Sequence, residues 1–189
     1  MATFTVLYDA CVLYPAPLRD FLLRLALTEL FRARWTETIH EEWMASVLAD
    51  RPDLTRAQLE RTRALMNAAV PDGLVEGYHR LIAGLTLPDP RDRHVLAAAI
   101  RAGAGAIVTF NLKDFPPEAL QSYGIEAQHP DAFVMDLLDL DHRKVCEAAR
   151  RQRRSLKNPP QTIREYLLNL ENQQLTQTRS RLQLYVDLL

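Results

Sequence analysis

The segment DPRDRHVLAAAIRAGAGAIVTFNLKDFP, residues 89–116, constrains the fold of this chain more than any other. Asp92 stands near the start of an alanine-rich run and Gly103 at its end, which predicts a helix with an acid in its first turn and a glycine stop. The apolar run AIVTF follows directly and predicts a buried strand. Asn111, Lys113 and Asp114 come immediately after that strand. A helix that leads at once into a buried strand is typical of α/β proteins.

The rest of the first 130 residues alternates between strand and helix signals in the same way. FTVLY, residues 4–8, predicts another strand, which ends at Asp9. PPEALQSYG predicts a short helix that stops at Gly124, and IEA predicts one more short strand. Apolar spacing predicts further helices over residues 18–34 and 74–85. Thr55 and Gln58 fit a capping box for a helix over residues 55–69. Thr38 and Glu41 fit another, for a helix that carries Ile39, Trp43 and Val47 on its apolar side.

The pattern becomes entirely helical from about residue 131. NPPQ at 158–161 interrupts the helical run, and Thr162 with Glu165 forms another capping box. We therefore expect two parts: residues 1–130 with a central parallel sheet flanked by helices, and residues 131–189 as a helical extension. In a parallel sheet the chemistry collects at the carboxyl ends of the strands, so Asp9, Asn111 and Asp114 are expected to meet at one edge.

Charge is distributed unevenly along the chain. Residues 1–142 carry 13 Lys and Arg against 20 Asp and Glu, whereas residues 143–165 carry 8 against 2. The basic segment includes Arg150, Arg151, Arg153, Arg154 and Lys157. Such a cluster can contact a polyanion, although a solvated helix face is the ordinary alternative.

Several classes of protein are disfavoured by the composition. The apolar runs are too short or too often interrupted by charge to span a bilayer, so no membrane association is expected. The N-terminus lacks the pattern of a signal peptide. Two cysteines, Cys11 and Cys146, are too few for a disulfide framework and show no zinc spacing. We expect a cytoplasmic protein.

Four acidic residues are candidates for one functional site: Asp9, Glu42, Asp92 and Asp114. Taken singly, each has an ordinary structural role as a cap, a first-turn acid or a solvated side chain. Gathered at one sheet edge they would repel one another, and a bound cation would offset that repulsion. Oxygen ligands without His or Cys favour Mg²⁺ or Mn²⁺ over zinc. The five histidines show no metal-ligand or triad spacing, and His94 is expected on the surface of its helix.

The joint pattern resembles the PIN-domain ribonucleases, and most closely the VapC-like toxins of type II toxin–antitoxin pairs. The resemblance is carried by VLYDACVLYP, TETIHEEW and DPRDRHVLAAAIRAGAGAIVTFNLKDFP, and it covers roughly residues 3–130. It implies a PIN-like α/β fold. The basic helical tail resembles the additional C-terminal region of some longer members.

The resemblance also implies roles for individual residues. Asp9, Glu42, Asp92 and Asp114 match the metal-binding acids of the family. Three further residues would support them: Asn111, which stands where many members have Asp, Thr109 through its hydroxyl, and Asp89 as a reserve ligand. Cys11 occupies a position where the family commonly has Ser or Thr, and its thiol donates only weakly.

The resemblance also implies metal-dependent hydrolysis of RNA phosphodiesters, with an antitoxin protein as partner and a homodimer as the expected assembly. Arg91, Arg93 and Lys113 would place positive charge at the rim, and the basic segment would bind either RNA or an acidic antitoxin segment. A phosphotransfer enzyme is disfavoured, because Asp9-Ala10-Cys11 lacks the D-x-D of phosphatases and the acidic pair of receiver domains is missing. A non-catalytic PIN-fold module that binds RNA or protein remains the alternative.

Overall fold

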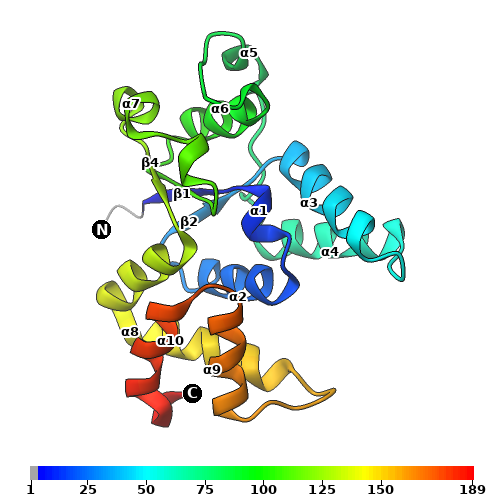
Figure 1. Cartoon of the computed structure of the whole chain (residues 1–189), viewed down its shortest axis with the longest axis vertical. Coiled ribbons are helices and arrows are strands. Elements are labelled where there is room, and N and C mark those ends of the chain that lie inside the picture. The colour runs from blue at the N-terminus through cyan, green and yellow to red at the C-terminus, as the bar shows by residue number, and fades with distance from the viewer. Residues whose placement is uncertain (1–3) are drawn as a thin grey trace. The chain divides into compact units, whose positions relative to one another are not determined.

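A computed structural model describes residues 4–189 of the chain. Its sheet contains four parallel strands in the order β2-β1-β3-β4. The strands are short, and their bounds are β1 Thr5–Tyr8, β2 Arg32–Arg34, β3 Ala106–Val108 and β4 Glu126–Gln128. The expected parallel sheet flanked by helices is therefore confirmed (Figure 1).

The described residues form two compact units that do not follow the order of the chain. The first unit contains residues up to Tyr14 together with Phe31–His129, and it holds the whole sheet. Its helices are α1 Ala10–Leu13, α3 Glu37–Asp50, α4 Arg56–Ala69, α5 His79–Ile82, α6 Arg93–Ala102 and α7 Pro117–Leu120, with 3₁₀ turns η1 Pro90–Asp92, η2 Leu112–Asp114 and η3 Gln121–Tyr123.

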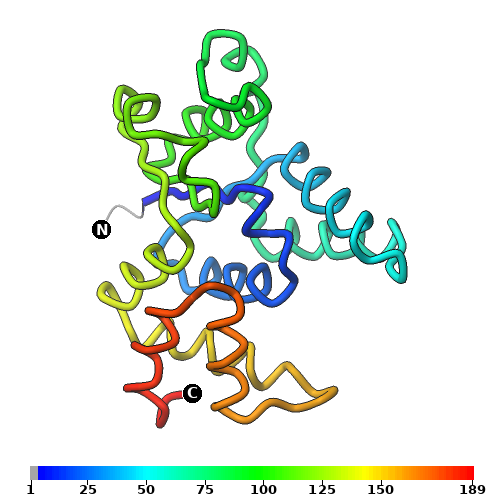
Figure 2. Tube along the Cα trace, viewed as in Figure 1, coloured from blue at the N-terminus to red at the C-terminus, as the bar shows by residue number. Residues whose placement is uncertain are grey.

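The second unit contains Pro15–Leu30 and Pro130–Leu189 and is entirely helical. Its elements are α2 Ala16–Ala26, α8 Pro130–Ser155, α9 Ile163–Asn172, α10 Thr176–Leu182 and η4 Gln183–Leu188. Figure 2 shows how the chain leaves β1, passes through α2 beside the much later α8, and returns to the sheet. Gln152 of α8 donates to the carbonyl of Pro17 at 2.8 Å, which ties these distant segments together.

The core of the first unit explains why these segments fold as they do. Residues 6–8 of β1 and 107–108 of β3 are fully buried. Residues 95–99 of α6 are also fully buried, because three consecutive alanines let this helix lie close against the sheet. The buried parts of both strands are apolar, so the polar residues Asp9 and Thr109 fall where the strands stop.

Several helix boundaries agree with the sequence predictions. Asp92 precedes α6, and the helix ends at Gly103, which takes the left-handed conformation at φ 61°. Gly124 does the same at φ 66° after η3. The capping boxes at Thr55–Gln58 and Thr162–Glu165 are both formed.

The helix predicted over residues 18–34 is wrong in its second half. Helix α2 ends at Ala26, and residues 32–34 form the strand β2. The register pairs Thr5 with Arg32 and Leu7 with Arg34. An Arg-Ala-Arg sequence has little intrinsic preference for strand, so its pairing with β1 decides the local structure.

Two other local predictions also need correction. The cap of α3 is Thr36, whose hydroxyl accepts the N–H of Ile39 at 3.0 Å, so the predicted Thr38–Glu41 capping box is wrong. The hydroxyl of Thr38 instead lies 2.8 Å from that of Tyr78. Of the helix predicted over residues 74–85, only His79–Ile82 is α-helical.

The region predicted to be helical from residue 131 onward is helical, with several short interruptions. Asp141 has non-helical dihedral angles inside α8, which divides this element into two helical segments. Gln174 has a positive φ of 63° and lies between α9 and α10. The predicted break at 158–161 contains the cis peptide bond between Asn158 and Pro159.

Candidate functional site

Asp9 leaves the carboxyl end of β1 and is held in a buried position. Its Oδ1 accepts the N–H of Ala10 at 2.7 Å, and its Oδ2 accepts the hydroxyl of Thr109 at 2.7 Å. Thr109 follows β3, the neighbouring strand, and is itself fully buried. The parallel pairing therefore brings together two residues that lie 100 positions apart in the sequence.

Cys11 connects the same two strand ends. Its thiol lies 3.2 Å from Oδ2 of Asp9, to which it donates, and 3.3 Å from the hydroxyl of Thr109. Its sulfur also accepts the N–H of Phe110 at 3.3 Å. Burial, and then the negative charge of Asp9, raises the pKa of this thiol to about 12, so it stays protonated at neutral pH. Cys11 thus acts as a weak donor to the carboxylate rather than as a nucleophile.

A pocket of about 560 Å³ opens beside these residues, at the carboxyl end of the sheet. Acidic side chains dominate its wall, and Arg91 is the one basic side chain among those that line it in the described part of the chain. The full lining is Asp9, Ala10, Cys11, Tyr14, Glu42, Ser46, Asp50, Asp89, Arg91, Asp92, Asn111 and Asp114.

Asp92 shows the electrostatic consequence of this crowding. Its pKa is raised to about 6, first because partial burial disfavours the charged form and then because Asp9, Asp89 and Asp114 repel it. His94 acts in the opposite direction. A bound cation would relieve both the desolvation and the repulsion.

Asp89 is occupied by local contacts. Its Oδ1 accepts the N–H of Arg91 at 2.9 Å and so caps η1, and its Oδ2 pairs with the guanidinium of Arg91 at 2.7 Å. Hydrogen bonds from Arg91 hold the pKa of this carboxyl below its usual value. The side chain of Arg91 is almost fully exposed, so its positive charge offsets the charge of Asp89 more than it offsets the negative charge of the whole pocket.

Glu42 is presented to the pocket by α3. Its Oε1 lies 2.7 Å from Nε2 of His94, on α6. The side chain of His94 is only 11% exposed. The prediction of His94 as a surface histidine is therefore wrong, because α6 turns that side chain toward α3.

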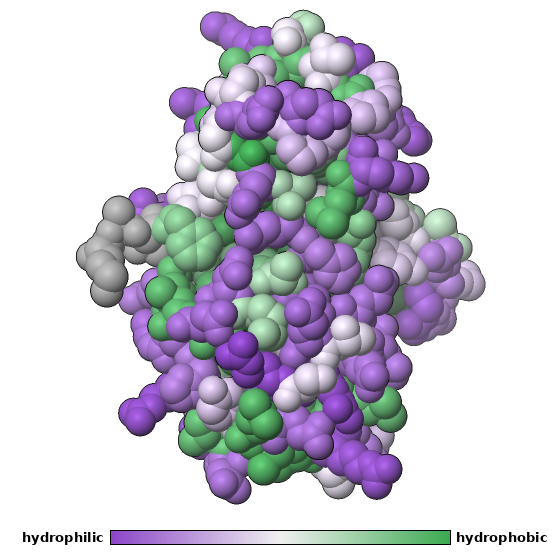
Figure 3. Space-filling view, turned by 60° about the vertical axis from the view of Figure 1, so that its left-hand side comes forward, coloured by the Kyte–Doolittle hydropathy of each residue, from purple (hydrophilic) through white to green (hydrophobic). Residues whose placement is uncertain are grey.

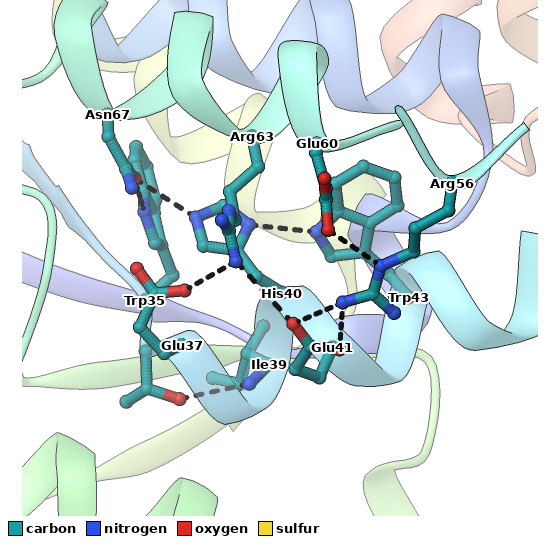
Figure 4. Close-up of polar contacts among 11 residues, drawn as sticks. Trp35, Glu37, Ile39, His40, Glu41, Trp43, Arg56, Glu60, Arg63 and Asn67 are labelled. Carbon is teal, nitrogen blue, oxygen red and sulfur yellow. Dashed lines mark hydrogen bonds and ion pairs between the residues drawn. The ribbon is translucent and has the colours of Figure 1, made fainter. Parts of the chain in front are cut away.

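A buried polar network fixes α3 behind this site (Figure 4). The indole of Trp43 donates to Nδ1 of His40 at 3.0 Å, and Nε2 of His40 lies 3.0 Å from the amide oxygen of Asn67 on α4. Trp35 donates to the same oxygen at 2.8 Å. Because Nδ1 accepts, His40 is in the neutral form with its proton on Nε2, and burial lowers its pKa.

Ion pairs on the outer side of α3 join it further to α4. Arg56 contacts both carboxylate oxygens of Glu41 and also reaches Glu60, while Arg63 lies between Glu37 and Glu41. The carboxylate of Glu41 therefore pairs with arginines of α4, whereas its neighbour Glu42 lines the pocket.

The predicted site residues fall into clear groups. Asp9, Glu42, Asp92, Asp114, Asn111 and Asp89 all line the one pocket, with Thr109 directly behind Asp9. Of the predicted basic rim, Arg91 lines it; Arg93 and Lys113 are not among the lining residues. Sequence reasoning missed Asp50, which accepts the hydroxyl of Tyr14 at 2.7 Å at the end of α3. The signal for it was weak, because an aspartate at a helix C-terminus looks like ordinary surface.

The predicted basic segment belongs to the other unit and is partly engaged there. Arg150 and Arg151 both pair with Glu147. Arg153 donates to the carbonyl oxygens of Gln161 and Leu189, so it stabilises the fold of the helical unit. Arg154 and Lys157 are exposed.

The donor set of the pocket fits a hard divalent cation in chemistry. Carboxylate oxygens with one amide are the ligands that Mg²⁺ and Mn²⁺ prefer, and burial followed by repulsion from neighbouring carboxylates raises the pKa of Asp92. Within residues 4–189, however, no three His, Cys, Asp or Glu side chains are already grouped closely enough to hold a metal ion. The acids therefore line the pocket without forming a finished cage.

No helix in the described residues is long and apolar enough to cross a membrane.

Comparisons with known proteins agree with this architecture. The family model described as PIN domain matches residues 5–113, and the one described as VapC50 C-terminal domain matches residues 130–184. A curated protein of Mycobacterium tuberculosis (strain ATCC 25618 / H37Rv) named "Putative ribonuclease VapC50" is 50% identical over 78 residues. That match covers 39% of this chain and 46% of the relative, so it spans less than half of that protein. No solved structure matches the chain.

Proposed function

The chain belongs to the PIN-domain family, and on that basis we propose that it is a metal-dependent endoribonuclease, the toxin of a toxin–antitoxin pair. One observation carries the proposal: acids from separate segments of the first unit line a single pocket at the carboxyl end of a parallel sheet. The relative named as a ribonuclease supports the same activity.

Asp9, Asp92, Asp114 and Glu42 would hold the cation, with Asn111 and Asp89 beside them. When bound, Mg²⁺ or Mn²⁺ supplies charge neutralisation at the phosphodiester and lowers the pKa of a water molecule. The residues of this chain position the ligands and control what enters the pocket. Thr109 and Cys11 fix the carboxylate of Asp9, and the acidic lining admits a phosphate only where positive charge accompanies it.

RNA binding needs positive charge outside the acidic pocket. Arg91 lies in the pocket wall, and Arg93 and Lys113 follow in the adjoining segments. Arg150, Arg151, Arg154 and Lys157 of the second unit would contact either RNA phosphates or an acidic antitoxin segment. Arg153 should be left intact in any test, because its loss would release Gln161 and Leu189 and disturb the fold.

We propose a division near residue 130 between the nuclease domain and the helical extension, a cytoplasmic location and a homodimer. Figure 3 shows hydrophobic side chains on the surface among the hydrophilic ones. The exposed apolar residues of the helical unit include Leu140, Leu168, Leu184, Val186 and Leu188. Sedimentation of the purified chain tests whether it self-associates.

Cleavage of a structured RNA in the presence of Mn²⁺ tests the activity. The wild type should cleave, and Asp9→Asn and Asp114→Asn should each lose activity by about 100-fold or more while keeping their circular dichroism spectra. Asp53→Asn is the matched control, because Asp53 is exposed and pairs with Arg51 outside the pocket. Cleavage that persists in Asp9→Asn or in excess chelator would refute the proposal.

A non-catalytic module that binds RNA or protein is the second candidate. In residues 4–189 no three His, Cys, Asp or Glu side chains are already grouped as a metal site, and this observation favours the non-catalytic module. Such a module would bind RNA equally well with and without a divalent cation and would leave the RNA intact.

A further inference from the structure

His94 occupies a position that neither the metal-binding acids nor the RNA contacts explain. It follows Asp92 by two residues at the start of α6 and is nearly buried. Nε2 lies 2.7 Å from Oε1 of Glu42, although its N–H is not aligned well enough with that oxygen to count as a hydrogen bond. The contact joins α6 to α3 beside the pocket.

Two other acids of the pocket are held by contacts that Glu42 lacks. Asp9 is held by Thr109 and the N–H of Ala10, and Asp89 is held by Arg91. Glu42 has a longer side chain than these aspartates and is 41% exposed. Holding such a side chain in one rotamer costs conformational entropy, so a partner is needed to keep it at the pocket.

The surrounding charges make His94 the natural partner. Arg56 and Arg63 are committed to Glu41, on the other side of α3. His94 also acts against the upward shift in the pKa of Asp92, so it influences two of the acids that line the pocket.

We propose that His94 is a positioning residue that holds Oε1 of Glu42 and thereby presents this carboxylate to the divalent cation. This inference rests on the proposed function, since it assumes that the pocket takes a cation. Partners that orient a ligating carboxylate typically change metal affinity by about 10- to 100-fold when they are removed.

Mn²⁺ calorimetry on four variants and one control variant tests the proposal without measuring activity. His94→Leu should weaken Mn²⁺ binding by about 10-fold or more, and His94→Gln should recover most of the loss because its amide N–H is a donor for the Glu42 carboxylate. Glu42→Gln should also weaken binding. In the double variant His94→Leu/Glu42→Gln, the loss should equal that of Glu42→Gln alone, because His94 acts through Glu42. His79→Leu is the matched control, since His79 is an exposed histidine that does not line the pocket.

The outcomes separate this inference from the proposed function. No Mn²⁺ uptake by the wild type would refute both. Uptake by the wild type with unchanged affinity in His94→Leu would refute only the role of His94. Losses that add in the double variant would also overturn it, because His94 would then act on the cation or on the fold by itself. Thermal unfolding of each variant shows whether a loss of affinity comes from a loss of structure.

Discussion

Replacing Asp92 by Asn should stabilise the cation-free protein at neutral and alkaline pH. In the folded chain this carboxyl has a pKa of about 6 instead of 3.8, because burial and three neighbouring carboxylates disfavour its charge. The folded state therefore holds a proton that the unfolded state releases between these two values. Stability from this group is highest below pH 3.8, falls as the pH rises through 6, and stays reduced above that.

The magnitude follows from the same shift. A fully buried carboxyl with this difference in pKa would lose about 3 kcal/mol of stability above pH 6. Asp92 is only partly buried, so solvent screening reduces the expected penalty to about 1 kcal/mol. For a chain of this size, about 1 kcal/mol corresponds to a rise in Tm of roughly 2–4 °C.

Urea unfolding of wild type and Asp92→Asn in excess chelator, at pH 4 and at pH 8, measures the effect. The variant should be more stable by about 1 kcal/mol at pH 8 and nearly equal to the wild type at pH 4. Added Mn²⁺ should reverse the order at pH 8, because it stabilises the wild type more. A variant that is no more stable than the wild type at pH 8, or a difference that does not depend on pH, would refute the reasoning.

Three further predictions concern the supports of the site and the fold. Cys11→Ser should keep the affinity for Mn²⁺, whereas Cys11→Ala should weaken it several-fold by freeing Asp9; equal affinities in calorimetry would contradict this. The contribution of His40 to stability should fall as the pH drops below 6.5, because protonating His40 breaks its bond from Trp43, so His40→Gln should lose less stability than the wild type between pH 7 and pH 5 in urea unfolding. Asp131→Ala should cost about 1–3 kcal/mol in the same assay, because the buried carboxylate accepts two backbone N–H groups at the start of α10; a loss no larger than that of an exposed aspartate would argue against this role.

The strand ends were predictable because local and global signals agree there. The run ending at Asp9 and the run before Asn111 are apolar enough to indicate buried strands, and parallel topology then places both ends at one edge. Glu42 and Asp92 needed the resemblance as well, because a charged residue on a helix carries no signal by itself.

Other features depend on tertiary contacts and could not be predicted locally. Strand β2 forms from Arg-Ala-Arg only because β1 offers a partner. Helix α2 packs with α8 in the second unit, although it follows β1 directly in the sequence. The burial of His94 depends on which face of α6 meets α3, and the apolar spacing of α6 alone did not indicate it.

The central claim is that carboxylates from distant segments form one cation-binding pocket, and Mn²⁺ calorimetry on wild type and Asp9→Asn tests it most directly. The wild type should bind Mn²⁺ with a measurable heat. In Asp9→Asn that heat should vanish, or the affinity should fall at least about 10-fold. Asp53→Asn, outside the pocket, should bind like the wild type. Equal binding by wild type and Asp9→Asn, or no binding by either, would contradict the account.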